Sequence, residues 1–384
     1  MNTRDYRTPQ AFVYRNHPKL NNGYLIALDA GYSSMKVFAE NKYFYFPTFV
    51  KKMGDDMLDI VQDNSIMYED LETGERYMLG QVAQNMVSAE DTSDTEGEWF
   101  SRKRYTNKKF HILCKAAIAI AIMGREDDRD IIIQTGLPTD YMGDIIELKK
   151  AICKDLKFKI RLGNQPWQVF DKGIEINPDN INVIPQPAGS LYSAMINKNG
   201  EMIADYIAKS STLVADIGFG TFDFFGVDKG KVKCKASITD VGMLEVLKHL
   251  SKKIREEFNE DIHVSAMQYI LEKGTVQCIE EDEEENLTEE ERPIAGMLQE
   301  ASKEVFTEAF DPAKSTTNNF RGYDNLIIAG GTGRAWIDYF NEKLKGMKSL
   351  NVIPCNKNDE IPFILGNVRG YYMFRYRAGV HTGS

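Results

Sequence analysis

One short pattern occurs twice in this chain, and a repeat of this kind dictates much of a fold. Residues 24–46 (YLIALDAGYSSMKVFAENKYFYF) and 211–234 (STLVADIGFGTFDFFGVDKGKVKC) align without a gap, which places Asp29 on Asp216. The same alignment pairs Gly31 with Gly218, Ser34 with Thr221 and Lys42 with Lys229. In both copies an apolar run ends in the aspartate, a glycine-containing turn follows, and a polar turn separates two more strand-like runs. Each copy must form the same supersecondary unit, and the pattern predicts a three-stranded antiparallel meander.

The first turn of each copy is a candidate phosphate site. Successive backbone amides in such a turn form a nest that binds anions, because glycine allows the positive φ angles required. A single turn of this composition is typical of an ordinary β-hairpin, but two in matched register indicate a metal-bound polyphosphate gripped from both sides. Lys36 could place its ammonium on a terminal phosphate, whereas Asp223 is either a site residue or structural. The candidates are Asp29, Gly31, Tyr32, Ser33, Ser34 and Lys36 in the first copy, and Asp216, Gly218, Phe219, Gly220 and Thr221 in the second.

A third glycine-rich segment lies later in the chain. The apolar run 324–329 predicts a buried strand, and a helix is expected from Arg334. Between them stand the candidate nucleotide-binding residues Gly330, Gly331, Thr332 and Gly333. Glycines let a nucleotide approach the backbone, and a helix N-terminus favours negative charge. The chain has no GxGxxG after its first strand and no GxxxxGKS/T, which argues against Rossmann and P-loop nucleotide sites.

Length and charge limit the remaining possibilities. A chain of 384 residues is long enough for two domains with separate cores. Its formal net charge of −10 argues against direct binding of nucleic acid or an anionic membrane, which requires a basic face. The longest apolar run, 116–123, is far shorter than the roughly 20 residues of a membrane span, and no signal-peptide core precedes it. Five scattered cysteines without metal-ligand spacing indicate free thiols, so we expect a cytoplasmic protein.

The rest of the chain alternates predicted helices and strands, which indicates an α/β fold with mixed sheets. We expect a strand at 130–135 and helices at 110–123, 141–154, 188–208 and 243–258. We expect residues 1–22 to form a flexible or surface-docked arm. The polar stretch 51–109, which contains SAEDTSDTEGE, is expected to form a small inserted subdomain. The acidic run 280–291 is expected to be a solvated loop leading into a helix, with Thr288 and Glu291 as its capping box.

Taken in order, the three glycine-containing segments resemble the phosphate-1, phosphate-2 and adenosine motifs of the actin-like ATPase superfamily. The matching residues are DAGYSSMK (29–36), DIGFGTFD (216–223) and IIAGGTGR (327–334). The resemblance implies an actin-like α/β fold of two ribonuclease-H-like domains, with a nucleotide cleft between them and an inserted subdomain in each. The implied parts are an N-terminal arm (1–22), domain I (23–205, with an insert at about 45–109, completed by 356–384) and domain II (206–355, with an insert at about 233–310).

Two further segments resemble the plasmid-segregation branch of this superfamily, the ParM type. They are TGLP (135–138), like its strand-ending turn, and GNVRGY (366–371), like the start of its last helix. The resemblance implies bound ATP, or GTP, with Mg²⁺ held by Asp29 and Asp216 largely through water. It also implies that Gln186, in PQPAGS, orients the attacking water, and that the two domains hinge about 183–188 and the last helix. ParM-type relatives usually carry glutamate near this proline and actin carries glutamine, so hydrolysis is expected at a rate the sequence leaves open.

Membership of this branch implies an ATP hydrolase that polymerises into dynamic filaments on binding ATP, disassembles after hydrolysis and drives plasmid DNA segregation. Its partners would be copies of itself and a DNA-binding adaptor on a centromere-like plasmid site. Three alternatives remain open: a sugar- or acetate-type kinase, a cell-shape or phage cytoskeletal actin homologue, and a monomeric chaperone-like ATPase module. A kinase usually needs a carboxylate base where Gln186 stands, and the chain has no room for a chaperone's peptide-binding domain and lid.

Overall fold

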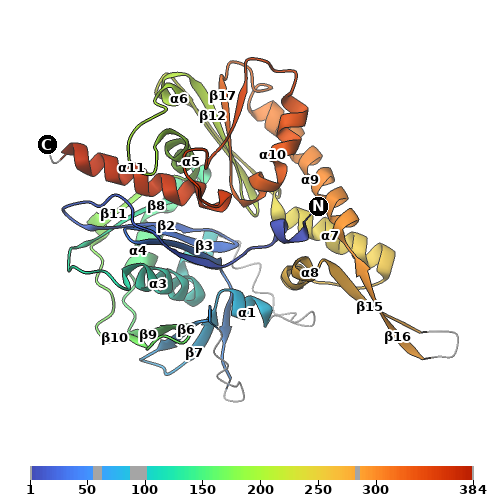
Figure 1. Cartoon of the computed structure of the whole chain (residues 1–384), viewed down its shortest axis with the longest axis horizontal. Helices are drawn as coiled ribbons and strands as arrows, with labels where there is room; N and C mark the ends of the chain where they lie inside the picture. The colour runs from blue at the N-terminus through green and yellow to red at the C-terminus, as the bar shows by residue number, and fades with distance from the viewer. Residues whose placement is uncertain (1, 55–62, 87–101, 282–285, 383–384) are drawn as a thin grey trace.

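The computed structural model describes residues 2–54, 63–86, 102–281 and 286–382; the acidic stretch SAEDTSDTEGE (88–98) lies outside these ranges. The chain forms two lobes, each built on its own β-sheet (Figure 1). We call the lobe that contains the first repeat the first lobe, and the lobe that contains the second repeat the second lobe.

The two central sheets have the same strand order. The first runs β1-β4-β3-β2-β8-β11. Its strands are β1 (Ala11–Tyr14), β2 (Tyr24–Ala30), β3 (Ser34–Ala39), β4 (Lys42–Pro47), β8 (Ile131–Leu137) and β11 (Ile181–Pro185). The second runs β14-β13-β12-β17-β18. Its strands are β12 (Ser211–Ile217), β13 (Thr221–Asp228), β14 (Lys231–Thr239), β17 (Asn325–Ala329) and β18 (Asn351–Pro354).

In both sheets an antiparallel meander continues into two parallel strands. The two predicted meanders and the strands predicted at 130–135 and 324–329 are therefore confirmed. The repeat extends further than the sequence indicated, because five strands of each sheet correspond one to one. The first sheet has one additional strand, β1, which the N-terminal residues add to the edge at β4.

Successive side chains of β2 face opposite layers, as the period of a strand requires. Ile26 and Leu28 pack in one core with α3 (Lys108–Ile122), beside which lies α4 (Ile145–Cys153). Leu25 and Ala27 belong to a second core that contains residues of α11 (Gly366–Thr382). The first sheet is thus covered on both faces, and α3 confirms the helix predicted at 110–123.

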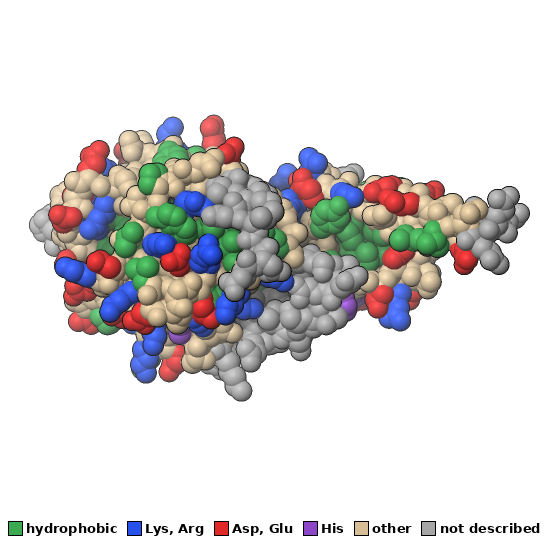
Figure 2. All heavy atoms as spheres, turned by 90° about the horizontal axis from the view of Figure 1, so that it is seen from below, with side chains coloured by type: hydrophobic (Ala, Val, Ile, Leu, Met, Phe, Trp, Pro, Cys, Tyr) green, Lys and Arg blue, Asp and Glu red, His purple; other side chains and the backbone are tan. Residues whose placement is uncertain are grey.

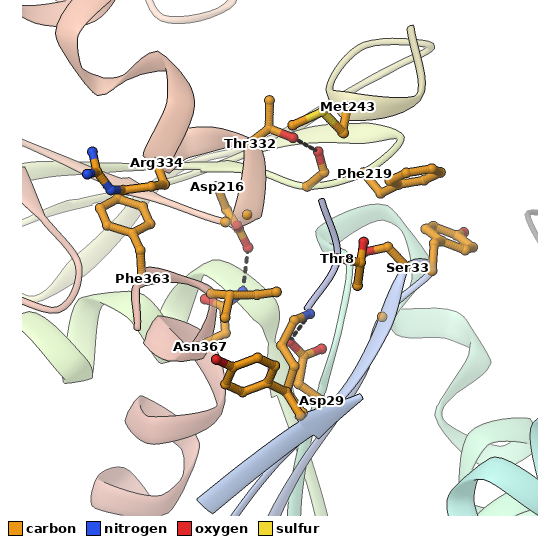
Figure 3. Close-up of a pocket in the computed structure, with 18 of the residues that line it drawn as sticks. Thr8, Asp29, Ser33, Asp216, Phe219, Met243, Thr332, Arg334, Phe363 and Asn367 are labelled. Atoms are coloured by element: carbon orange, nitrogen blue, oxygen red, sulfur yellow. Dashed lines mark hydrogen bonds and ion pairs between the residues drawn. The ribbon is translucent and has the colours of Figure 1, made fainter. Parts of the chain in front are cut away.

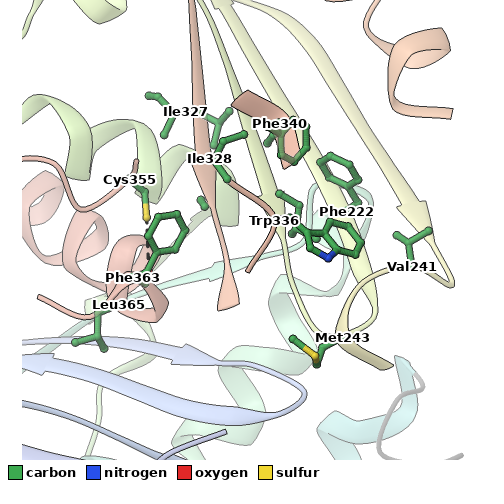
Figure 4. Close-up of a cluster of buried hydrophobic side chains, with 14 of the residues drawn as sticks. Phe222, Val241, Met243, Ile327, Ile328, Trp336, Phe340, Cys355, Phe363 and Leu365 are labelled. Carbon is green, nitrogen blue, oxygen red and sulfur yellow. Dashed lines mark hydrogen bonds between the residues drawn. The ribbon is translucent and has the colours of Figure 1, made fainter. Parts of the chain in front are cut away.

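In the second lobe, α9 (Ala295–Thr316) and α10 (Gly331–Leu344) pack beside the sheet. Phe222 of β13 lies against Phe340 of α10, in an aromatic cluster that includes the fully buried Trp336 (Figure 4). This burial removes several large apolar surfaces from water, each contributing roughly 1.5–3 kcal/mol. It also holds α10 against the sheet at the end where the third glycine-rich segment lies.

Each lobe carries an inserted part. In the first lobe a sheet of order β10-β9-β6-β7-β5 is joined by α1 (Gln81–Asn85). Its strands are β5 (Val50–Lys52), β6 (Ile66–Asp70), β7 (Arg76–Leu79), β9 (Phe158–Leu162) and β10 (Gln168–Phe170), so the chain after α4 completes it. The second lobe adds α7 (Met243–Phe258), as predicted, α8 (Met267–Lys273) and a hairpin of β15 (Thr275–Glu281) and β16 (Leu287–Pro293). The hairpin projects from the rest of the molecule. Apolar and acidic side chains are exposed together on it (Figure 2).

The structure corrects the expectation for the acidic run 280–291. Of this run, residues 280–281 and 287–291 are paired as the strands β15 and β16, and α9 begins only after Pro293. Thr288 does not cap a helix, because its hydroxyl donates to the carbonyl of Glu280 across the hairpin (3.1 Å). The guanidinium of Arg292 offsets part of the negative charge by contacting Glu280 (2.6 Å) and Glu290 (3.0 Å).

The helix predicted at 188–208 is shorter than expected. α5 (Gln186–Met195) ends before a turn in which the side-chain oxygen of Asn197 accepts from the amide of Glu201 (3.0 Å). Gly200 completes this turn with a φ of +82°, a conformation that glycine adopts without strain. Only a short helix, α6 (Tyr206–Lys209), follows. The helix predicted at 141–154 likewise starts as a 3₁₀ turn, Thr139–Asp144, before α4.

Two helices cross between the lobes. α5 follows β11 of the first sheet but packs mainly on the second sheet, whereas α11 follows the second sheet and packs on β2, β3 and β8 of the first. Where they cross, a Cβ atom on Gly370 would overlap the carbonyl of Gly189, so the close approach depends on glycine. These two helical connections between the lobes lie together at one place, which suits a hinge.

His17 packs beside Tyr372 of α11, and its ionisation is predicted to make the stability of the fold depend on pH. Its ring stacks on Phe38 (centroids 4.0 Å apart), and Nδ1 lies 2.6 Å from the carbonyl oxygen of Ala39. Burial, aided by Arg15 and Arg369 and opposed by the Ala39 hydrogen bond and by Asp359, lowers the pKa of His17 to about 4. The folded chain therefore binds fewer protons here than the unfolded chain between about pH 4 and 6.5.

We expect the contribution of His17 to the free energy of unfolding to be fully present above about pH 6.5. It should fall by roughly 3 kcal/mol as the pH drops to about 4. Urea unfolding of the parent chain and of His17→Phe, at about pH 7 and about pH 5, measures the effect. The variant keeps an aromatic ring but cannot take up a proton, so its stability should fall less. Equal losses in both proteins would show that other groups cause the acid sensitivity.

Candidate functional site

A cavity of about 350 Å³ lies between the lobes (Figure 3) and has the size and position of a small-molecule site. The predicted residues that line it are Asp29, Gly31, Tyr32, Ser33, Lys36, Gln186, Asp216, Gly218, Phe219, Thr221, Gly330, Gly331 and Thr332. Three predicted residues are outside its lining: Ser34, Gly220 and Gly333. Ser34 is fully buried, and the backbone of Gly333 lies close to Ile328 and Phe363. The fold therefore brings segments from both repeats and from the third glycine-rich segment to one place.

The two repeated turns have the same backbone hydrogen bond. The amide of Gly31 donates to the carbonyl of Ser34 (3.1 Å), and the amide of Gly218 donates to the carbonyl of Thr221 (2.8 Å). These four residues are the ones that the sequence alignment pairs. The correspondence therefore holds at the level of individual hydrogen bonds, and each turn presents its backbone to the same cavity.

Asp29, at the end of β2, is held on both carboxylate oxygens. Lys36, directly opposite it on β3, contacts one oxygen with its ammonium at 3.0 Å. The side-chain amide of Gln186, the first residue of α5, donates to the other at 3.3 Å. The sequence suggested Lys36 as a phosphate ligand and Gln186 as a water-orienting residue; the structure places both beside Asp29, where a ligand in the cavity would meet all three.

Asp216, at the matching position of β12, has different neighbours. Its carboxylate accepts a hydrogen bond from the side-chain amide of Asn367 (2.6 Å), which in turn accepts from the hydroxyl of Ser190 (2.6 Å). The residue opposite Asp216 on β13 is Asp223, where the first repeat has Lys36. The two halves of the site are thus alike in backbone but unlike in charge.

This difference in charge appears in the ionisation of the second turn. Burial, with the nearby carboxylates of Asp223 and Asp29, raises the pKa of Asp216 to about 7, although Asn367 and Lys36 favour the ionised form. Burial also raises the pKa of Asp223 to about 6, against its hydrogen bonds from Ser237 and Thr221. A cation placed between the lobes would relieve this repulsion.

The third segment closes the site from the side of the second lobe. α10 begins at Gly331, three residues before the predicted start at Arg334, so its first-turn amides face the cavity. Gly330 has a φ of +83°, and a Cβ atom there would overlap the carbonyl of Ile217. The hydroxyl of Thr332 donates to the carbonyl of Gly218 (2.6 Å) and so ties this segment to the second repeated turn.

Sequence reasoning missed several residues that line the cavity. Asn367 stood in a segment noted for its resemblance but received no role, although a buried asparagine at the start of a helix is a recognisable signal. The others are Tyr45, Arg104, Pro138, Met243, Arg334, Pro362, Phe363, Ile364 and residues 4–9 of the N-terminal segment. No local pattern marks these positions, because their place in the site depends on how the lobes meet.

The residues present fit a hydrated magnesium–nucleotide. Among the described ranges, no group of three or more His, Cys, Asp or Glu side chains is arranged to hold a metal ion directly. Asp29 and Asp216 approach from opposite lobes, and two amide-bearing turns and the start of a helix line the same cavity. Mg²⁺ retains several waters and binds through one or two carboxylates together with substrate phosphates. The side chains thus match that mode and not a metal caged by protein alone.

Comparisons with known proteins agree with this geometry. Residues 27–189 match the family described as the N-terminal domain of actin-like proteins. The chain is similar to a 15-stranded ParM filament from Clostridium botulinum (TM-score 0.68, 19% identity, covering 93% of this chain and 99% of that one). It is also similar to an archaeal actin homologue in complex with ADP (TM-score 0.60, 15% identity, 92% and 99% covered) and to the Alp12 filament (TM-score 0.56, 16% identity, 95% and 100% covered).

No curated protein matches the chain significantly. In the part of the chain that the structure describes, every helix is too short or too polar to cross a membrane. The chain has the actin-like fold, and the resemblance inferred from the three glycine-containing segments is confirmed.

Proposed function

We propose that this chain, an actin-like protein by its fold, binds ATP with Mg²⁺ between its lobes, polymerises in that state and disassembles after hydrolysis. The observation that carries the proposal is the pair of related turns around one cavity, with Asp29 and Asp216 on opposite sides. The similar structures support it, because they include two filaments and a complex with ADP.

In this proposal each side of the cavity has its own task. The two turns and the start of α10 bind phosphate oxygens through backbone amides, and Asp29 and Asp216 hold the waters around the metal. Bound Mg²⁺ supplies charge stabilisation for phosphoryl transfer. Gln186 positions the attacking water; an amide is too weak a base to remove its proton, so its contribution is orientation.

A nucleotide held by both lobes couples the state of its γ-phosphate to the angle between them. The hinge is the crossing of α5 and α11 at Gly189 and Gly370, next to Gln186 and Asn367 on the same two helices. A rotation there changes the faces that each copy presents to the next. Head-to-tail contacts between identical copies form a ring only if the rotation from one copy to the next closes. If it does not close, the contacts continue and give a filament.

The cellular role proposed for these filaments is plasmid DNA segregation in the cytoplasm. A net charge of −10 gives the filament little attraction for DNA, so a DNA-binding adaptor on a centromere-like site would make the connection. Both the adaptor and this role rest on the ParM-type resemblance.

Sedimentation and light scattering test the filament. We expect a pellet and a rise in scattering when ATP and Mg²⁺ are added, followed by a decline as phosphate is released. Samples with ADP, with EDTA and with GTP in place of ATP serve as controls and decide the preferred base. The filament proposal is wrong if ATP gives neither signal at any protein concentration. ATP consumption that depends on an added sugar or acetate acceptor would favour the kinase alternative.

A further inference from the structure

The N-terminal segment joins the two lobes across the cavity. In Figure 1 the blue segment runs from the second lobe, beside α7 and α8, to the edge of the first sheet. It starts with a 3₁₀ turn, Thr3–Tyr6, and ends in β1. We call residues 3–10 the strap. Residues 4–9 of the strap line the same cavity as the two repeated turns, and Thr8 is seen there in Figure 3.

One end of the strap is fixed to the second lobe. The hydroxyl of Thr3 donates to the carbonyl of Leu271 in α8 (2.7 Å). The phenol of Tyr6 donates to the hydroxyl of Ser302 in α9 (3.0 Å), and its ring is buried in the core of that lobe. Farther along, the backbone amide of Thr8 donates to the side chain of Gln268 (2.9 Å). These contacts use buried side chains and backbone, unlike those of a loosely attached terminus.

The other end is fixed to the first lobe. The side chain of Gln10 accepts from the amide of Gln81 at the start of α1 (2.9 Å) and donates to the carbonyl of Asn64 (2.5 Å). From Ala11 onward the backbone pairs with β4. Arg7 connects both lobes through one side chain, since its guanidinium contacts Glu272 of α8 (2.5 Å) and Asn85 of α1 (3.1 Å).

The strap has little slack. Only Pro9 and Gln10 separate Thr8, anchored by its backbone to the second lobe, from Ala11 in the first sheet. A chain spans at most about 3.3–3.6 Å per residue. The lobes therefore cannot move far apart at this edge of the cavity unless one set of anchors is broken.

We propose that the strap closes the nucleotide cavity and limits the rate at which nucleotide leaves it. This inference rests on the proposed function, because it assigns a gate to the same site. A nucleotide contacted by both lobes leaves when they separate, and separation at this edge requires the strap to detach first. The strap is then a kinetic element of the site that neither repeated turn supplies.

Dissociation of a fluorescent ATP analogue tests the proposal. The probe is N-methylanthraniloyl-ATP with Mg²⁺, chased with excess unlabelled ATP at protein concentrations that give no pellet. Deletion of residues 2–10 removes the strap but leaves β1, and we expect release at least about tenfold faster, since several buried hydrogen bonds no longer oppose opening. Arg7→Ala should accelerate release less, because Tyr6 and Thr8 remain anchored.

Tyr14→Ala is the matched control, because Tyr14 lies outside the strap, pairs with Lys42 on β4 of the first sheet and is 66% exposed. Its release rate should equal that of the parent. A deletion variant that is folded by circular dichroism, binds the analogue and releases it at the parental rate would overturn the proposal.

If the parent binds no analogue, the proposed function fails. Whether the strap restrains the two lobes is then tested without nucleotide. Small-angle X-ray scattering of nucleotide-free protein then compares parent and deletion variant. A larger radius of gyration after deletion supports a strap that restrains the lobes, and an unchanged radius overturns it.

Discussion

Replacement of Asp216 by alanine is expected to abolish magnesium-dependent nucleotide hydrolysis, with a loss of at least about a hundredfold to a thousandfold. The carboxylate is buried, oriented by Asn367 at 2.6 Å and lines the cavity opposite Asp29. Without it, the second lobe would lack the carboxylate that the proposed site places opposite Asp29 for a hydrated Mg²⁺. Phosphate release with and without added Mg²⁺ measures the effect, and Asp205→Ala, at an exposed position of the same lobe, is the control.

Asp216→Asn separates loss of chemistry from loss of fold. Burial and neighbouring carboxylates raise the pKa of Asp216 in the parent protein to about 7. Because the folded chain holds this proton more tightly than the unfolded chain, the free energy of unfolding falls as the pH rises from about 4 to 7. Asparagine keeps the shape and can still accept from Asn367, so this variant should be inactive and at least as thermally stable as the parent. An active Asp216→Asn variant would show that this carboxylate does not serve the metal.

The second large effect concerns Gln186. We expect Gln186→Ala to slow hydrolysis about a hundredfold while leaving nucleotide binding and assembly intact. The side-chain amide reaches the cavity from the first turn of α5 and contacts Asp29 at 3.3 Å, but the two repeated turns close their own backbone hydrogen bonds without it. Filaments of the variant should therefore persist longer than those of the parent.

A time course of phosphate release beside a time course of pelletable protein measures both parts of this prediction. Gln165→Ala, in an exposed turn of the first lobe, is the control. If Gln186→Ala hydrolyses ATP at the parental rate, another residue orients the water. If it fails to assemble, Gln186 supports the nucleotide-bound conformation rather than the chemistry.

The parts of the site that could be predicted are those encoded by neighbouring residues. The turn at Gly31 and the turn at Gly218 each close a local hydrogen bond, to Ser34 and to Thr221, so residues three apart suffice to predict them. The buried strands before them follow from continuous apolar runs. The same reasoning recovered the strand before Gly330 and placed the start of α10 only three residues late.

Two predicted elements differ from the structure, although the contacts that decide them are close in the sequence. The run 280–291 was expected to be a loop because of its charge, but residues 280–281 and 287–291 pair as β15 and β16 and contact Arg292. Likewise, a helix was predicted through 188–208, where a side-chain–backbone turn at Asn197 ends α5 instead. In both cases an interaction that periodicity does not register outweighed local preference.

By itself, the amino-acid sequence determined two meanders, two aspartate-bearing turns and a third glycine-rich segment, because these follow from local periodicity and turn chemistry. The tertiary structure alone decided that these segments surround one cavity, that Asp29 meets Gln186 while Asp216 meets Asn367, and that the N-terminal segment joins the lobes. The physical reason is that these contacts join residues far apart in the chain, and local periodicity and turn chemistry do not record which distant segments meet.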